Sequence, residues 1–354
     1  MGIAAKLWRF SRSLAGMREE TPHLLSQDIF LKQYRHSSRN GNRGVSVGDC
    51  PEGIEMKPPA FAYYAPTRID DTLRMLHEFV REQNLDVKLL AGGQSLVPLL
   101  NMRLAHPEVI VDLNPLEPQL NYMRRDGDML RIGALTRYYV LRTNPEILQH
   151  CPMLADAAGL IGHVAILTRG TIGGSLVHAD PAAELPLVFA TLSGMVTLQS
   201  AQGSRVIDAR DFFLTYLTTS VEPDEILTEV ALPIMPAHSG QAIEEFSMRH
   251  GDFALVAAAA QVTLAADASW QGARLVLGGV APTPADCSHL LVPFVGKRPT
   301  QPELREALHP IEDEIDPQGD IHASTAYRKE LAQTLAYRAI ERAIRYADSA
   351  SPEQ

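Results

Sequence analysis

Hydrophobic and polar residues recur along most of the chain at two spacings, which predict a succession of helices and strands. A helix is expected over 67–83, where Leu73, Leu76 and Phe79 recur at helical spacing on one face. Strands are expected at three short apolar runs, 87–90, 109–113 and 129–133. This alternation of helices and strands indicates α/β layering in the first half of the chain.

The remaining elements complete an α+β prediction. Further helices are expected at 95–102, 152–160, 182–192 and 327–346, and further strands at 195–199, 205–208 and 226–232. Beyond the boundary marked by Pro233 and Pro236, residues 256–265 and 274–278 predict a hairpin joined at Ser269–Gly272, with a helix as the alternative because of the many alanines. We therefore expect one domain at about 56–236 and a smaller one at 240–350.

Residues 1–55 have a different pattern and are expected to form an N-terminal extension without fixed structure. Apolar residues at near-helical spacing alternate with basic ones up to Gly16, and a Ser-, Asn- and Gly-rich stretch follows. Two alternatives are an amphipathic helix that binds a surface or partner, and a true translation start at Met56. No cleavable secretory signal is recognisable.

Composition narrows the function without identifying it. The 354 residues carry 32 basic and 42 acidic side chains, a net charge of −10 that argues against nucleic-acid binding. Cys50, Cys151 and Cys287 lie far apart with no Cys-x-x-Cys, so we expect neither a disulfide framework nor a metal site built by this chain alone. No apolar run approaches the roughly 18 residues of a membrane span. A cytoplasmic protein is expected.

Two glycine loops carry the strongest chemical signal, Ala91-Gly92-Gly93-Gln94-Ser95 and Thr171-Ile172-Gly173-Gly174-Ser175. Glycine permits positive φ and lets a ligand approach the main-chain N–H groups, which together cradle anions. Neither loop matches the Rossmann or Walker pattern. Two such loops suit a pyrophosphate held from both sides. Glu184 could then bond ribose hydroxyls or an adenine-side group, or it could be a solvated charge in a helix first turn.

The runs Lys88–Leu96 and Thr171–Pro181 resemble the FAD-binding medium subunit of molybdenum hydroxylases, the aerobic carbon monoxide dehydrogenase and xanthine dehydrogenase family. Arg249–Ala254 resembles the loop of that family near the flavin, and Gly278–Pro284 fits its C-terminal domain. The resemblance covers about 56–346. It implies a two-part FAD-binding domain of the PCMH/vanillyl-alcohol-oxidase type and a C-terminal CO-dehydrogenase-flavoprotein-like domain, an antiparallel sheet with helices.

The resemblance also implies roles for single residues. Both glycine loops would hold the pyrophosphate of FAD, and Glu184 its ribose end. Ile161 and Leu232 would pack against the flavin ring, with ordinary core packing as an equal alternative. Asp252 would lie beside the isoalloxazine, or it could simply cap its loop. Gln94 stands where related flavin oxidases carry the histidine that links to flavin, so non-covalent FAD is expected.

The function implied is electron transfer rather than substrate chemistry. The chain would relay electrons from a [2Fe-2S] cluster on a small partner subunit, through FAD, to an external acceptor, with the molybdenum cofactor on a large partner subunit. No catalytic residue is assigned, and His163 and His178 are expected to be structural. The alternatives are a self-sufficient flavin-dependent oxidoreductase, which would need its own base, and a non-catalytic scaffold, against which the intact glycine pairs argue.

Overall fold

The computed structural model describes residues 57–349, and the chain divides between Glu117 and Pro118 into two compact units. The predictions made for residues 1–55 and for a start at Met56 lie outside the described residues.

The first unit is built on a parallel three-stranded sheet in the order β1-β3-β2. Its strands are β1 (Ala62–Tyr64), β2 (Val87–Leu90) and β3 (Val109–Asp112), and its helical segments are α3 (Ile69–His77), η1 (Glu78–Glu82), α4 (Leu96–Asn101) and η2 (Asn114–Leu116). The predicted helix at 67–83 is therefore α3 and its π-helical continuation η1. Asp70 and Asp71 occupy the first turn of α3, where negative charge is favourable. The strands predicted at 87–90 and 109–113 are confirmed.

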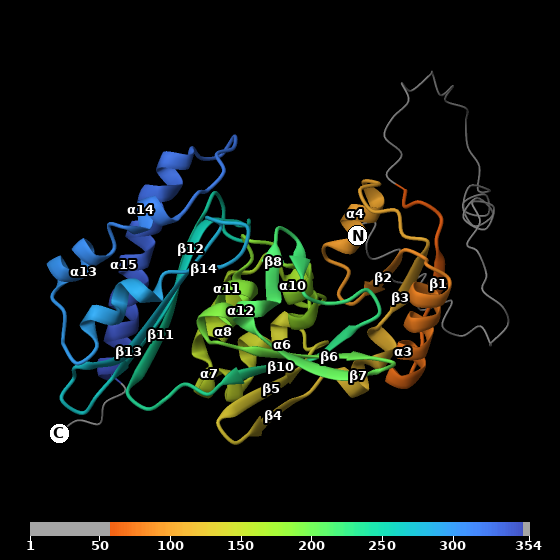
Figure 1. Ribbon diagram of the computed structural model, residues 1–354, viewed down its shortest axis with the longest axis horizontal. Coiled ribbons are helices and arrows are strands. Elements are labelled where there is room, and N and C mark those ends of the chain that lie inside the picture. Colours follow the sequence, from red (N-terminus) through yellow and green to blue (C-terminus); the bar gives the residue numbers. More distant parts are fainter. Residues whose placement is uncertain (1–56, 350–354) are drawn as a thin grey trace, which may run out of the picture. The chain divides into compact units, whose positions relative to one another are not determined.

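The second unit begins with a five-stranded antiparallel sheet in the order β4-β5-β10-β6-β7 (Figure 1). Its strands are β4 (Met123–Asp126), β5 (Met129–Gly133), β6 (Met195–Ser200), β7 (Gly203–Asp208) and β10 (Ile226–Pro233). The helices are α5 (Glu117–Leu120), which begins at the last residue of the first unit, α6 (Tyr138–Thr143), α7 (Pro145–His150), α8 (Pro152–Leu160), α9 (Val164–Leu167), α10 (Ile172–His178), α11 (Glu184–Thr191) and α12 (Ala209–Phe212). A short ribbon of β8 (Phe213–Thr215) and β9 (Thr218–Thr219) follows α12. Leu130, Ile132 and Val230 alternate into a core shared with α8 and α11.

A second sheet, β11-β12-β13-β14, fills the rest of this unit, and the long helix α15 (Thr325–Ser349) lies along it (Figure 1). Its strands are β11 (Ser239–Ser247), β12 (Ala254–Leu264), β13 (Trp270–Gly278) and β14 (Ala285–Asp286), followed by η3 (Ser288–Phe294), α13 (Gln301–Ala307) and α14 (Ile311–Glu314). The buried residues of this helix include several alanines, among them the fully buried Ala336 and Ala343. A Cβ on Gly240 would stand 1.9 Å from the Ala343 carbonyl oxygen, so this close approach requires glycine.

The predicted hairpin exists, and the helical alternative for its alanine-rich strand is wrong. Its turn, however, lies at Ala265–Ser269 and not at Ser269–Gly272. Ala268 adopts a left-handed φ of 61°, and Asp267 accepts the Ser269 N–H at 3.0 Å. Trp270 belongs to β13 because its indole is buried in the core, with 1% exposed. No helix within 57–349 is long and apolar enough to cross a membrane.

Candidate functional site

The first glycine loop joins β2 to α4 and requires glycine at one of its two positions. Gly93 has a φ of +72°, a left-handed conformation that is costly for residues with a Cβ. A Cβ there would also stand 3.1 Å from carbons of Leu90 and Val97. Gly92 is buried without a positive φ. The strained conformation is therefore confined to Gly93.

The backbone of this loop leaves three consecutive donors without partners. In the described part of the chain, no acceptor bonds the N–H groups of Gly92, Gly93 and Gln94. The Gln94 side chain instead folds back, and its amide donates to the Gly92 carbonyl at 3.1 Å. Gly92 is buried, where an N–H group is rarely left unpaired, whereas Gly93 and Gln94 are half-buried. The loop is therefore suited to accept an anionic group from outside the chain.

Two polar residues at the end of β3 brace the loop. Asn114 donates from its side-chain amide to the Ala91 carbonyl at 2.9 Å. Asp112, only 3% exposed, accepts the Asn114 N–H at 2.9 Å and the Tyr63 hydroxyl at 2.6 Å. Sequence reasoning treated Asn114 only as a strand end. The signal available in the sequence is an aspartate and an asparagine at the end of an apolar run, Val109–Asn114.

The second glycine loop has a different structure despite its similar sequence. Thr171 is the N-cap of α10, and its hydroxyl accepts the Gly174 N–H at 3.1 Å. The Gly173 N–H donates to the Ala134 carbonyl at 2.9 Å, and the Ser175 N–H donates to the Thr171 carbonyl at 3.0 Å. Neither glycine has a positive φ. The expectation of positive φ in both loops is therefore wrong here, because these glycines lie inside a helical turn.

Close packing is the reason for glycine in this second loop. A Cβ on Gly173 would come within 2.8 Å of the Ala134 carbonyl oxygen and Cβ atom. A Cβ on the preceding Gly170 would stand 2.3 Å from the ring of Tyr138. The loop thus presses against the segment after β5, and its half-buried Gly174 and Ser175 are the parts left to meet a ligand.

Buried polar groups surround the second loop. Glu184, only 5% exposed, begins α11. Burial raises the pKa of Glu184 to about 8, with a further contribution from the negative charge of Glu245. Burial also raises the pKa of Glu245 to about 7, and its Oε2 atom has no hydrogen-bond partner in 57–349. Tyr138 has a pKa raised to about 12 by burial, opposed by a hydrogen bond with the Ser175 side chain.

Glu184 is therefore a buried carboxyl and not the solvated charge of its alternative. Glu245 was missed by sequence reasoning, because a glutamate in a strand is usually exposed. Its half-buried position depends on the pairing of β11 with β12, where it lies opposite Ala257.

The structure also brings two of the predicted ring-side segments together. A Cβ on Gly251 would meet the Gly162 carbonyl oxygen at 3.1 Å, so the loop carrying Asp252 abuts the turn after Ile161. Asp252 is exposed, and Ile161 is half-buried. Leu232, in contrast, is 1% exposed inside the core. Core packing accounts for Leu232 with no cofactor present, and its contact with a flavin stays a prediction.

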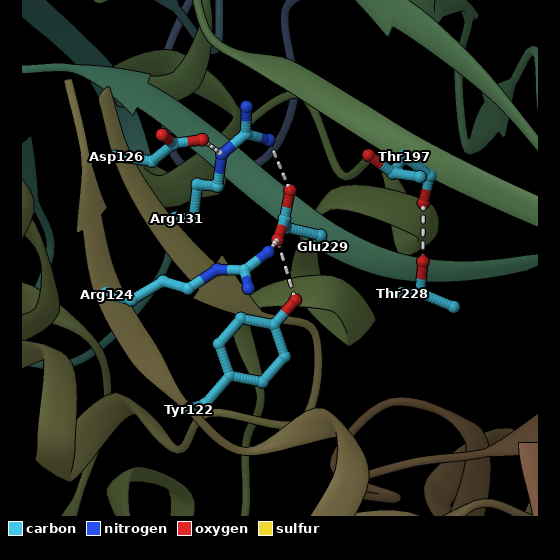
Figure 2. A network of polar contacts seen from close by, with 7 residues as sticks. All are labelled: Tyr122, Arg124, Asp126, Arg131, Thr197, Thr228 and Glu229. Atoms are coloured by element: carbon cyan, nitrogen blue, oxygen red, sulfur yellow. Dashed lines mark hydrogen bonds and ion pairs between the residues drawn. The ribbon is translucent and has the colours of Figure 1, made fainter. Parts of the chain in front are cut away.

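A polar network on β4, β5 and β10 lies outside these segments (Figure 2). Glu229 accepts hydrogen bonds from Tyr122 at 2.7 Å, Arg124 at 3.1 Å and Arg131 at 2.6 Å. Burial would raise the pKa of Glu229, but the bonds from Tyr122 and Arg131 hold it below its usual value. Arg131 also pairs with Asp126 at 2.7 Å. Because both carboxylate oxygens of Glu229 accept hydrogen bonds, the network links neighbouring strands and offers no free base.

The two histidines considered as general bases are not positioned for that role. His163 is exposed at the start of α9, which corrects the expectation of a histidine satisfied within the structure. His178 is half-buried in the last turn of α10. Within 57–349 neither imidazole has a hydrogen-bonding partner that would orient it for proton transfer.

The residues present fit a dinucleotide cofactor rather than a reacting substrate. The first loop offers three N–H donors, and the second unit offers a hydroxyl on Ser175 and the buried carboxyl of Glu184. These are the groups that recognise phosphate oxygens and ribose hydroxyls. Taken unit by unit, these groups indicate a protein that binds a nucleotide cofactor.

Comparisons with known proteins are consistent with this class and narrow it. Residues 59–235 match the FAD binding domain in molybdopterin dehydrogenase, and residues 241–343 match the CO dehydrogenase flavoprotein C-terminal domain. The 6-hydroxypseudooxynicotine dehydrogenase complex subunit alpha of Paenarthrobacter nicotinovorans is 39% identical, over 82% of this chain and 97% of its own. The nicotine 6-hydroxylase medium subunit of the same organism is 36% identical, over 80% of this chain and 98% of its own.

A solved structure supports the same family. The reconstituted CO dehydrogenase from Oligotropha carboxidovorans aligns with a TM-score of 0.77 at 31% identity, over 82% of this chain and 99% of the matched chain. The chain belongs to the family of FAD-binding medium subunits of molybdenum hydroxylases. It is an oxidoreductase flavoprotein, as the sequence predicted.

Proposed function

We propose that this chain is the electron-transfer subunit of a molybdenum-containing hydroxylase or dehydrogenase, and that it relays electrons from a partner [2Fe-2S] cluster to an external acceptor through non-covalent FAD. The observation that carries the proposal is the first glycine loop, with three consecutive unpaired N–H donors and a left-handed Gly93. Membership of the FAD-subunit family supports it independently.

Different residues of the chain bind different parts of the cofactor. The pyrophosphate oxygens accept hydrogen bonds from the N–H groups of Gly92, Gly93 and Gln94. Because the N–H groups of the second loop are already bonded, that loop contributes the Ser175 hydroxyl and a closely packed wall. Glu184 binds the ribose hydroxyls.

The other predicted contacts complete the assignment. Ala91, Ser95, Thr171, Ile172, Gly173 and Gly174 shape the two loops. Ile161, Leu232 and Asp252 lie on the ring side. Bound FAD supplies the redox chemistry, and the protein orients it and sets its electrostatic surroundings.

Partners follow from the relatives. One relative is named as a subunit of a dehydrogenase complex and another as a medium subunit, so we infer a small iron–sulfur subunit and a large molybdenum subunit for this chain too. The two cysteines in the described part, Cys151 and Cys287, are buried and unpaired, which suits a reducing cytoplasm. The two family matches cover residues 59–235 and 241–343, which supports domains at 56–236 and 240–350.

The test is purification of the native complex through this chain, with iron, molybdenum and FAD quantified. We expect all three to copurify. Nicotine, caffeine and nicotinate, named for relatives, are then mixed anaerobically with the complex and with the isolated chain. Flavin bleaching should require the partners. Bleaching of the isolated chain by a substrate would instead favour a self-sufficient flavin-dependent oxidoreductase, and FAD without iron or molybdenum would refute the complex.

A further inference from the structure

Each of the three N–H donors of the first glycine loop shares a peptide plane with a carbonyl group that is already bonded. A trans peptide plane holds its C=O and N–H groups in opposite directions, and no peptide within 57–349 is cis. The direction of each N–H group is therefore fixed by whatever donates to the carbonyl of the same plane. The partners of these three carbonyls show how the loop keeps its donors in place.

The first and the third plane are held by groups outside the glycine pair. The Ala91 carbonyl lies in the plane of the Gly92 N–H, and it accepts the side-chain amide of Asn114 at 2.9 Å. The Gly93 carbonyl, in the plane of the third donor, accepts the Val97 N–H at 3.1 Å as α4 begins. A neighbouring segment therefore orients the first donor, and the following helix orients the third.

The middle plane depends on a side chain of the loop itself. The Gly92 carbonyl lies in the plane of the Gly93 N–H, and it accepts the side-chain amide of Gln94 at 3.1 Å. No other donor bonds this carbonyl in the described part of the chain. Glycine on both sides leaves this plane free to rotate, because neither residue has a Cβ to restrict it. The Gln94 amide is therefore the group that fixes the direction of the Gly93 N–H.

We propose that the Gln94 side chain is a positioning group for the cofactor and keeps the Gly93 N–H turned toward the pyrophosphate. This inference rests on the proposed function, in which the main-chain N–H of Gln94 is one of the three donors, and it adds a role for the side chain. A donor that is already oriented loses less freedom when the ligand binds, so affinity rises without a new contact. The side chain thus acts through the loop and need not touch FAD.

Gln94→Met tests this role, because methionine has a similar length and cannot donate to the Gly92 carbonyl. FAD is titrated into the FAD-free full-length chain, and phosphorus NMR spectra are recorded on the FAD-saturated protein. We expect FAD affinity to fall about fivefold, the size of one neutral hydrogen bond, with no change in chemical denaturation of the FAD-free chain. The phosphorus resonances of bound FAD should shift, because one donor to the pyrophosphate is displaced, while flavin absorbance stays the same.

Gln83→Met is the matched control, because the Gln83 amide donates to Glu78 at 2.9 Å in the same unit and outside the loop. It should change neither FAD affinity nor the phosphorus resonances. Wild-type affinity in Gln94→Met would overturn the inference, as would a lower affinity with wild-type phosphorus resonances, the result of a purely structural role. A wild-type chain that binds no FAD would refute the proposed function and this inference with it.

Discussion

The two glycine loops are alike in sequence and unlike in structure. Both have a glycine pair followed closely by serine, yet the first leaves three N–H groups unpaired and the second pairs its own. Gly93 is left-handed, whereas Gly173 lies in the first turn of α10. The first loop uses glycine for conformation and the second uses it for close packing.

Different neighbours produce this difference. The first loop follows a parallel strand and is held from one side by Asn114, so its N–H groups face no acceptor. The second forms a β-bridge between Thr171 and Arg137, and the N–H groups of Ile172 and Gly173 bond the nearby carbonyls of Thr136 and Ala134. A repeated motif therefore does not imply a repeated function. Mutations in the first loop should therefore reduce FAD binding, and mutations in the second loop should reduce stability.

The largest effect is expected for Gly173→Ala. The added Cβ would collide with Ala134, so the free energy of unfolding should fall by about 3 kcal/mol. Chemical denaturation of the FAD-free chain measures this. Gly272→Ala is the matched control, because nothing lies within 4 Å of its added Cβ, and it should change stability by no more than about 0.5 kcal/mol. Equal stability of the two variants would show that the second loop can shift freely.

Gly93→Ala should affect the cofactor more than the fold. A left-handed alanine costs about 1–2 kcal/mol. Relief of that strain would turn the N–H groups away, so FAD affinity should fall at least tenfold in a fluorescence titration. Gly127→Ala carries a similar φ of +59° in open space and serves as the control. If both variants bind FAD like the wild type, the first loop is not the anion cradle.

Glu245→Gln tests the buried carboxyls beside the second loop. A carboxyl pKa raised by folding contributes stability below the unfolded value near 4.5, and this contribution is lost as pH rises through about 7. At pH 8 the FAD-free variant should therefore be about 2 kcal/mol more stable than wild type, with the difference vanishing near pH 4.5. Glu244→Gln, which breaks the 3.2 Å pair with Arg342, should show no such gain. A pH-independent difference would contradict the burial of a protonated carboxyl.

The smallest effect is expected for Thr171→Val. Loss of the hydroxyl that accepts the Gly174 N–H should cost about 1 kcal/mol of stability, and Thr171→Ser should restore most of it. Thermal unfolding of the three proteins measures the difference. A Thr171→Val protein of wild-type stability would mean that the N–H bonds of this loop are not formed, and the contrast between the loops would fail.

Sequence pattern predicted most of the fold because local periodicity controls most of its elements. The helix α3 and the strands β2, β3 and β5 follow directly from the spacing of apolar residues. Strand β11 was missed because its buried side is determined by pairing with β12 and by contact with α15, which no local pattern reveals.

The candidate site was predictable only in part for the same reason. The glycine pairs are visible in the sequence, and the family resemblance gave their ligand. The brace from Asn114 and the burial of Glu245 arise from residues brought together by folding. The conformational contrast between the loops also needs the structure, because the bonds that distinguish them reach to Ala134 and Thr136, far from the loop in sequence.

Titration of the FAD-free full-length chain with FAD and with FMN tests the central claim most directly. If the first loop holds the pyrophosphate, which FMN lacks, FAD should bind at least a hundredfold more tightly than FMN. Acid precipitation of the loaded protein should release all of the flavin, since a glutamine, Gln94, and not a histidine follows the first glycine pair. Equal affinity for FMN, or flavin that stays with the precipitated protein, would contradict the account.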